Sequence, residues 1–286
     1  MKTRIFFIVI LIICLIGGVI FNVTSATDNI EKLIEKLGTF RKDDRDEAMW
    51  KLVSIGEPAV EPLIKSLQYK HIIGNKTAAE TLGEIGKPSF KPLIAALKDP
   101  NNSETFHYYA AEALVNTIKT VKDTFPPAAA LSEDLKKAKS EKSVNVSLGY
   151  KPGILITKSG EKLPEQIERL KGLTKHIVDY LAQNGYVISE APDLRLEVEY
   201  MERHASTIWK TNNLNFKFGS YYRYSVKGKN NNVLIEQKWD GPMAGRFDNA
   251  PNTFGKNNLQ GAERTVLKAL DTIFMLRLIG VDKGEW

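Results

Sequence analysis

The chain has a single cysteine, Cys14, and this residue lies inside an apolar run near the N-terminus. The remainder of the 286 residues therefore carries no thiol. This absence excludes a disulfide framework, a cysteine-ligated zinc site and a cysteine nucleophile from everything that follows the run. Domains without such cross-links have to be held together by their hydrophobic cores.

Histidine is also scarce, and no familiar catalytic or metal-binding motif is present. The four histidines lack H-x-x-x-H and H-E-x-x-H spacing, and none stands next to an acidic residue. There is no G-x-S-x-G elbow, and the KSGEK stretch at residues 158–162 lacks the glycine spacing of a phosphate loop. Glu197 and Glu199 are paired carboxylates, but their alternation with apolar residues places them on the solvated face of a strand. The sequence predicts no catalytic residues, no metal site and no cofactor.

Neither sign of charge is in large excess. The sequence has 40 Lys and Arg against 34 Asp and Glu, a formal net charge of +6 at pH 7. This surplus is too small to argue for a nucleic acid partner. A hydrophobic content of 43% and a charged content of 26% are typical of folded proteins, and the length allows one large domain or two ordinary ones.

The N-terminal residues 1–26 have the pattern of an export signal. Lys2 and Arg4 precede an apolar run at residues 5–21, and Thr24-Ser25-Ala26 offers small residues to signal peptidase. Two fates stay open, because 17 apolar residues lie at the lower edge of a membrane-spanning length. The segment is either cleaved after Ala26 or retained as a membrane anchor. In both cases the remainder is expected on the extracytoplasmic side, in the periplasm or cell envelope.

One sequence motif occurs twice in the first half of the chain. IGEPAVEPLIKSL begins at Ile55, and IGKPSFKPLIAAL begins 30 residues later at Ile85. Upstream, residues 45–56 align with residues 75–86, and a third copy covers residues 107–118. Apolar positions at i, i+3 or i+4, and i+7 predict a helix in each copy, followed by a second helix. We expect Leu63, Leu67, Leu93 and Leu97 to be buried on the second helices.

Glycine and proline mark the boundaries of these predicted helices. Gly56 and Gly86 are expected to end the first helices, because glycine tolerates the left-handed conformation after a helix. Pro62 and Pro92 would break a helix interior, so each second helix is expected to begin only a few residues before its proline.

Helical pairs of this size cannot bury their apolar faces alone and must stack on one another. The stretch 28–122 resembles the short HEAT repeats of the phycobilin-lyase-like type, on AAETLGEIGKPSFKPLIAALKD (78–99), AAEAL (110–114) and IGEPAVEPLI (55–64). That family usually has a Val-Arg pair ahead of the Ala-Ala, but here only the first copy has the arginine, Arg45, and the equivalent places are occupied by Asn75 and His107. The resemblance implies an all-α stack of helical hairpins, capped by residues 28–38, with a groove that binds another protein. The candidate partner-binding residues are the outward positions of the second helices, Glu61, Lys65, Lys91 and Lys98.

In the second half of the chain the spacing of apolar residues changes from that of helices to the alternation of strands. Residues 123–142 are rich in alanine and charge, and we expect a part-helical cap that passes into a linker. From residue 143 onward, alternating strands are expected at 144–148, 193–203, 214–228 and 230–241, with a short strand at 154–156 and helices at 163–181 and from 262 onward. This order predicts an α+β domain over residues 143–286, with a mostly antiparallel sheet and helices on one face.

A basic and aromatic stretch at residues 203–229 contains no acidic residue. Such stretches bind single-stranded nucleic acid, anionic polymers or lipid head groups in some proteins. Strand alternation places most of its aromatic side chains on the core face. The opposite face carries the candidate anion-binding residues Lys217, Tyr221, Arg223 and Lys227. Glu197 and Glu199 on a neighbouring strand are expected to neutralise them.

The leading hypothesis from the sequence is a non-enzymatic extracytoplasmic binding or scaffold protein, with another protein as its partner. One alternative is an envelope enzyme whose site lies in the C-terminal domain, with the long loop at residues 241–258 as a lid. Another is a binder of anionic surface polymers or lipids through the basic strand. Nucleic acid is not expected as a partner, and membrane contact is expected only through residues 5–21 if they are not removed.

Overall fold

The computed structural model describes residues 29–39, 41–69, 72–152, 174–208, 215–228, 231, 233–243 and 266–281. The predicted export signal or anchor, the short strand at 154–156 and most of the 241–258 loop lie outside these residues. The chain divides into two compact units, Met1–Ala129 and Ala130–Trp286. The division falls within helix α7 (Pro126–Glu141), which covers most of the segment expected to be only part-helical.

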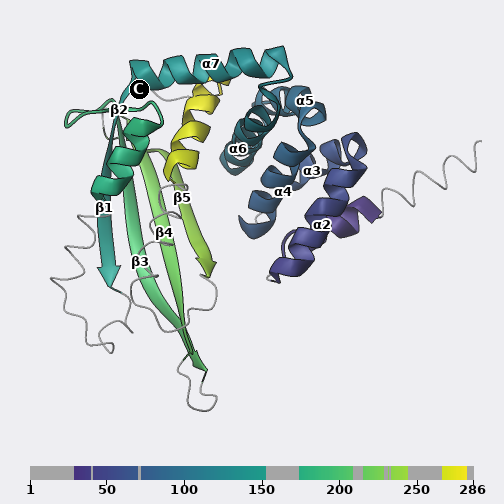
Figure 1. Ribbon diagram of the computed structural model, residues 1–286, viewed down its shortest axis with the longest axis horizontal. Coiled ribbons are helices and arrows are strands. Elements are labelled where there is room, and N and C mark those ends of the chain that lie inside the picture. Colours follow the sequence, from purple (N-terminus) through teal and green to yellow (C-terminus); the bar gives the residue numbers. More distant parts are fainter. Residues whose placement is uncertain are drawn as a thin grey trace, which may run out of the picture. The chain divides into compact units, whose positions relative to one another are not determined.

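The described residues of the first unit form helices and the turns between them, and no strands (Figure 1). A helix at residues 29–36 comes first. It is followed by α2 (Lys42–Ile55), the 3-10 turn η1 (Glu57–Ala59), α3 (Val60–Ser66), α4 (Ile72–Ile85), α5 (Lys87–Leu97) and α6 (Glu104–Val121). Helix α2 packs on α4, α4 packs on α6, and α3 packs on α5. The helical stack predicted from the repeat is therefore present in this unit.

Glycines end the first helices of both copies, as predicted. Gly56 has φ 73° and Gly86 has φ 78°, values that cost a residue with a Cβ free energy. Their backbone N–H groups donate to the carbonyls of Leu52 and Leu82 respectively, at 3.1 and 3.2 Å. Each glycine therefore closes one helix and lets the next begin directly after it.

The two prolines behave differently from each other. Pro62 is the third residue of α3, where its missing N–H costs nothing, as expected. Pro92, in contrast, lies inside α5, because that helix begins five residues earlier at Lys87. The prediction that α5 begins only a few residues before Pro92, in the first turn where its missing N–H costs nothing, was therefore wrong. In the first copy the corresponding residues, with Pro58, form the 3-10 turn η1, whereas in the second copy they, with Pro88, form the first turn of α5.

The core of the first unit is built from the predicted leucines. Leu63, Leu67, Leu93 and Leu97 are 0, 0, 0 and 1% exposed, which confirms the phase assigned to the second helices. Helices α4 and α6 approach closely, since a Cβ on Gly83 would stand 2.5 Å from the Asn116 Cβ. The lack of a side chain at Gly83 therefore allows the first helices of the second and third copies to pack this closely.

The second unit contains a five-stranded sheet in the order β2-β1-β3-β4-β5 (Figure 1). Its strands are β1 (Ser143–Pro152), β2 (Val187–Ile188), β3 (Leu194–Ile208), β4 (Asn215–Gly228) and β5 (Val233–Met243). Two further helices cover residues 174–183 and 266–279. Gly241–Met243, expected at the start of a loop, instead form the end of β5.

The sheet is mixed, and the expectation of a mostly antiparallel sheet was wrong. Strand β1 pairs in parallel with both β2 and β3, whereas β3, β4 and β5 form an antiparallel meander. Parallel pairing of β1 with β3 requires a crossover, and the helix at residues 174–183 lies within it. At the start of the pair, the Ser143 backbone N–H and hydroxyl both donate to Asp193 Oδ2 at 2.9 Å.

One face of the β1–β3 pair is buried and the other is polar. Val144 and Val146 on β1, and Leu194 and Leu196 on β3, point to the same side and are at most 4% exposed. The intervening residues include the exposed Arg195 and the half-buried Glu197. This alternation is the pattern of a sheet covered on a single face. None of the helices in the described residues combines the length and the apolar character needed to span a membrane.

Candidate functional site

The four candidate partner-binding residues lie on the second helices of the first unit. Glu61 and Lys65 belong to α3, Lys91 belongs to α5, and Lys98 follows α5 directly. All four are exposed, and α3 packs beside α5. The structure therefore places them on the outer surface of two adjoining helices.

Three lysines form a stripe along α5, and one of them was missed by the sequence reading. Lys87, Lys91 and Lys98 are all exposed. Their spacing of four and eleven positions brings them within about 40° of one another around the helix axis. We call these three residues the lysine stripe. Lys87 was overlooked because it precedes the first apolar position of α5, but its i, i+4 relation to Lys91 was visible in the sequence.

The lysine stripe has no acidic partner in the described part of the chain. None of the ion pairs there includes Lys87, Lys91 or Lys98. Asp99 adjoins Lys98, but its Oδ1 accepts hydrogen bonds from the Asn101 backbone and side chain at 3.0 and 2.9 Å. The Lys87 ammonium instead lies 5.2 Å from the centre of the Phe125 ring, a weak cation–π contact at an exposed site.

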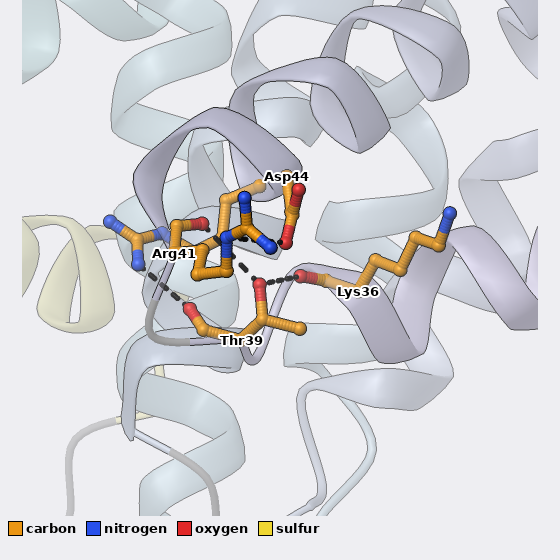
Figure 2. Close-up of polar contacts among 5 residues, drawn as sticks. Lys36, Thr39, Arg41 and Asp44 are labelled. Carbon is orange, nitrogen blue, oxygen red and sulfur yellow. Dashed lines mark hydrogen bonds and ion pairs between the residues drawn. The ribbon is translucent and has the colours of Figure 1, made fainter.

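Both lysines of α2 and its N-cap arginine, by comparison, pair with carboxylates on that helix. Lys51 Nζ lies 2.5 Å from Glu47 Oε1, Lys42 pairs with Asp46, and Arg41 pairs with Asp44 at 3.4 Å (Figure 2). The hydrogen bond from Lys51 lowers the pKa of Glu47. Helix α5 thus differs from α2 in that none of its lysines belongs to an ion pair in the described residues, and the same holds for Lys65 on α3.

Arg45 of the first copy contacts the turn before α2. The Thr39 hydroxyl donates to the carbonyl oxygen of Lys36 at 3.0 Å and to that of Arg41 at 3.4 Å (Figure 2). Arg45 is half-buried, and its Nη1 donates to the Thr39 carbonyl at 2.7 Å. Arg45 thus stabilises the turn that leads into its own helix.

Equivalent positions in the two copies carry opposite charge. Glu57 and Glu61 of the first copy correspond, 30 residues later, to Lys87 and Lys91 of the second. Carboxylates in a first helical turn interact favourably with the helix dipole, whereas a cation there is unfavourable by about 0.3–1 kcal/mol. Helix α5 has no acidic residue in its first turn to offset Lys87. The position of Lys87 is therefore unfavourable with respect to the dipole of α5.

The basic strand was the other predicted site, and the structure describes it only in part. All four of its candidate residues lie on β4, where Tyr221 is opposite Met201, and Arg223 is opposite Glu199. The side chains of Lys217, Tyr221 and Arg223 lie outside what the structure describes. The Lys227 ammonium lies 2.7 Å from Glu197 Oε2 on β3. This pair is the neutralisation that the sequence predicted for that lysine.

Because Lys227 pairs with Glu197 and Arg223 is opposite Glu199, we expect no binding of heparin through β4 at about 150 mM salt. The measurement is retention on a heparin column, compared with a Lys217/Arg223/Lys227 triple alanine variant. Retention of the original chain that is lost in the variant would contradict this expectation and favour the anionic-polymer alternative, since each phosphate-like or sulfate-like contact releases counterions.

A buried ionic cluster in the second unit was not predicted. The Lys139 ammonium on α7 lies 2.5 Å from Asp271 Oδ1 on the helix at 266–279. The Tyr186 hydroxyl donates to the same oxygen at 2.9 Å, and the ammonium lies 4.8 Å from the centre of the Tyr186 ring. All three residues are at most 9% exposed.

The electrostatics of this cluster favour a structural role. Burial, followed by the charge of Asp271 and the hydrogen bond to it, raises the pKa of Tyr186 well above its ordinary value. Phe274 packs edge-on against the Tyr186 ring, with centroids 5.4 Å apart. The three polar groups satisfy one another and are enclosed. The available signal in the sequence was Asp271 itself, an acidic residue on the apolar face of the last predicted helix.

No metal centre is formed by the described residues, in which no three or more His, Cys, Asp or Glu side chains gather. His107 Nε2 lies 3.1 Å from the Asp99 carbonyl oxygen, and His176 is exposed. His71 and His204 are not described. The same holds for residues 244–258, which make up most of the loop considered as a lid.

Comparison with known proteins gives little to set beside this geometry. No protein-family model matches the chain, and no curated protein matches it. Among solved structures, it is similar to a protein from Helicobacter pylori described as a neuraminyllactose-binding hemagglutinin homolog. The identity is 13% and the TM-score 0.30, over 44% of this chain and 78% of that one. A likeness of this size carries no argument about fold or function.

Proposed function

We propose that the protein is a non-enzymatic, extracytoplasmic binding or scaffold protein that holds another protein on the outer surface of α3 and α5. The observation that carries this proposal is the lysine stripe, whose charges are exposed and unmatched while the apolar side of the same helix is filled. Helical-pair stacks of the HEAT type bind proteins on extended surfaces formed by successive repeats. The extracytoplasmic location rests on the export pattern of residues 1–26.

Charge reversal on this surface provides the test. We expect a Lys65→Glu/Lys91→Glu variant of the full chain to lose cross-linking to its partner in the native envelope, because both side chains are exposed and belong to the proposed contact. Its melting temperature should stay within a few degrees of the original, since exposed substitutions usually change stability by less than about 0.5 kcal/mol.

The matched control is Lys32→Glu/Lys36→Glu, which reverses two exposed lysines of the helix at residues 29–36. This variant has the same change in net charge on the same unit, and it should keep the cross-link. Cross-linking that survives in both variants would exclude the surface of α3 and α5 as the binding site.

A further inference from the structure

We infer that the partner presents an acidic polypeptide segment to the lysine stripe of α5. This inference rests on the proposed function, since it names the chemistry of the partner for the same surface. The stripe consists of Lys87, Lys91 and Lys98, and no acidic residue interrupts the sequence between Ile85 and Lys98. Ala95 is exposed between Lys91 and Lys98, and its small side chain leaves the helix surface between these two lysines accessible.

The dimensions of the stripe fit an extended segment. At about 1.5 Å of rise per residue, the stripe is about 16 Å long, and Lys87 and Lys91 are about 6 Å apart along the axis. Side chains on one side of an extended chain repeat every 6.4–6.8 Å or so. A segment with acidic residues at alternate positions therefore offers about one carboxylate to each lysine as it follows α5.

The surroundings of the stripe favour a polypeptide over other polyanions. Glu57 and Glu61 are exposed on the preceding turn and on α3, which packs beside α5, and Lys65 follows them on α3, so the surface of the two helices carries both signs of charge. A nucleic acid or an anionic membrane presents negative charge over a broad area, and these two carboxylates would repel it. A polypeptide can place carboxylates against the lysines and a neutral or basic residue against the glutamates.

The electrostatics of α5 also favour an anionic occupant. Lys87 stands in the first turn, where the helix dipole disfavours a cation, and the first turn holds no carboxylate of its own. A bound carboxylate would interact favourably with the lysine and with the positive end of the helix. The first copy has its own carboxylates at the corresponding positions and gains nothing from such a ligand.

A defined peptide tests the inference. The probe is a fluorescein-labelled peptide of six Glu-Ser pairs, titrated by fluorescence anisotropy with the full chain in non-ionic detergent at 50 mM salt. We expect saturable binding that weakens by about tenfold or more at 300 mM salt, because exposed charges are screened over a few ångströms there. A Lys91→Glu/Lys98→Glu variant should bind at least about tenfold more weakly, which corresponds to two unfavourable charge contacts.

The Lys32→Glu/Lys36→Glu variant again serves as the matched control and should bind the peptide within about twofold of the original, since exposed charges outside the contact act only through the screened field. Absence of binding at 50 mM salt, or equal losses in the two variants, would overturn the inference. So would tighter, Lys91- and Lys98-dependent binding of a single-stranded oligonucleotide or of phosphatidylglycerol vesicles, since it would assign the stripe to another class of ligand.

These outcomes separate the inference from the proposed function. If the peptide does not bind but the envelope cross-link still depends on Lys65 and Lys91, the surface binds a protein of another chemistry, and only the inference fails. If the peptide binds through the stripe but the cross-link is independent of these lysines, the proposed function fails.

Discussion

Replacing Leu93 by alanine is expected to lower the free energy of unfolding by about 2–5 kcal/mol, the range for removing a buried leucine side chain from a packed core. Leu93 lies in α5 and is 0% exposed. Helix α5 packs on both α3 and α6, so neighbours on two sides hold the cavity open and limit how far it can collapse. The measurement is denaturant unfolding followed by the helical circular dichroism signal.

The matched control for this substitution is Lys91→Ala, two positions away on the same helix. Lys91 is exposed and makes no ion pair in the described part of the chain, so its truncation should change stability by less than about 0.5 kcal/mol. A loss of less than about 0.5 kcal/mol for Leu93→Ala as well would mean that the assigned phase of α5 is wrong.

The helical stack could be predicted because its signals are local and repeated. Gly56 and Gly86 end helices through their own backbone conformation, and the leucines of the second helices recur at fixed spacing. Both kinds of information are contained in a stretch shorter than one copy of the repeat. The exception was Pro92, whose position inside α5 depends on where the helix starts, and that start differs between the two copies.

The second unit was predicted less well because its pairings are distant in sequence. Strand β1 pairs with β3 about 50 residues away, Val144 with Leu194 for example. Alternation reports which residues face the core, but it does not report the direction of the neighbouring strand. The antiparallel β3–β4–β5 meander was recoverable from short connections, whereas the parallel β1–β3 pair was not.

Distance in sequence also explains why the buried ionic cluster was not predicted. The exposed positions of α3 and α5 followed from helical phase. The buried cluster joins Lys139, Tyr186 and Asp271, which come from three separate segments of the second unit, and nothing local links them. Lys139 in particular lies in a helix whose other lysines, Lys136 and Lys137, are exposed.

Removing one member of the Lys139–Asp271 pair is expected to cost much more than removing both. Asp271→Asn leaves a buried ammonium without its carboxylate, and Lys139→Met leaves a buried carboxylate without its cation. We expect each single change to lower the free energy of unfolding by about 3–5 kcal/mol. In the Lys139→Met variant the Tyr186 hydroxyl still donates to Asp271, so this loss should fall at the lower end of the range.

The triple variant Lys139→Met/Tyr186→Phe/Asp271→Leu replaces the pair, and the buried tyrosine hydroxyl that donates to Asp271, by apolar groups of similar size. Its stability should be within about 1 kcal/mol of the original, because no unpaired charge and no unsatisfied hydroxyl remains. The control cycle uses Glu133 and Lys136 on the same helix, whose ion pair at 2.6 Å has side chains 70 and 64% exposed. Replacing either of these by alanine should change stability by no more than about 1 kcal/mol, since water solvates the partner that is left. All these variants are compared by denaturant unfolding. If the substitutions of Lys139 and Asp271 change the free energy of unfolding as little as those of Glu133 and Lys136, water reaches the cluster. Lys139 and Asp271 would then not act as a buried ionic pair that joins α7 to the last helix.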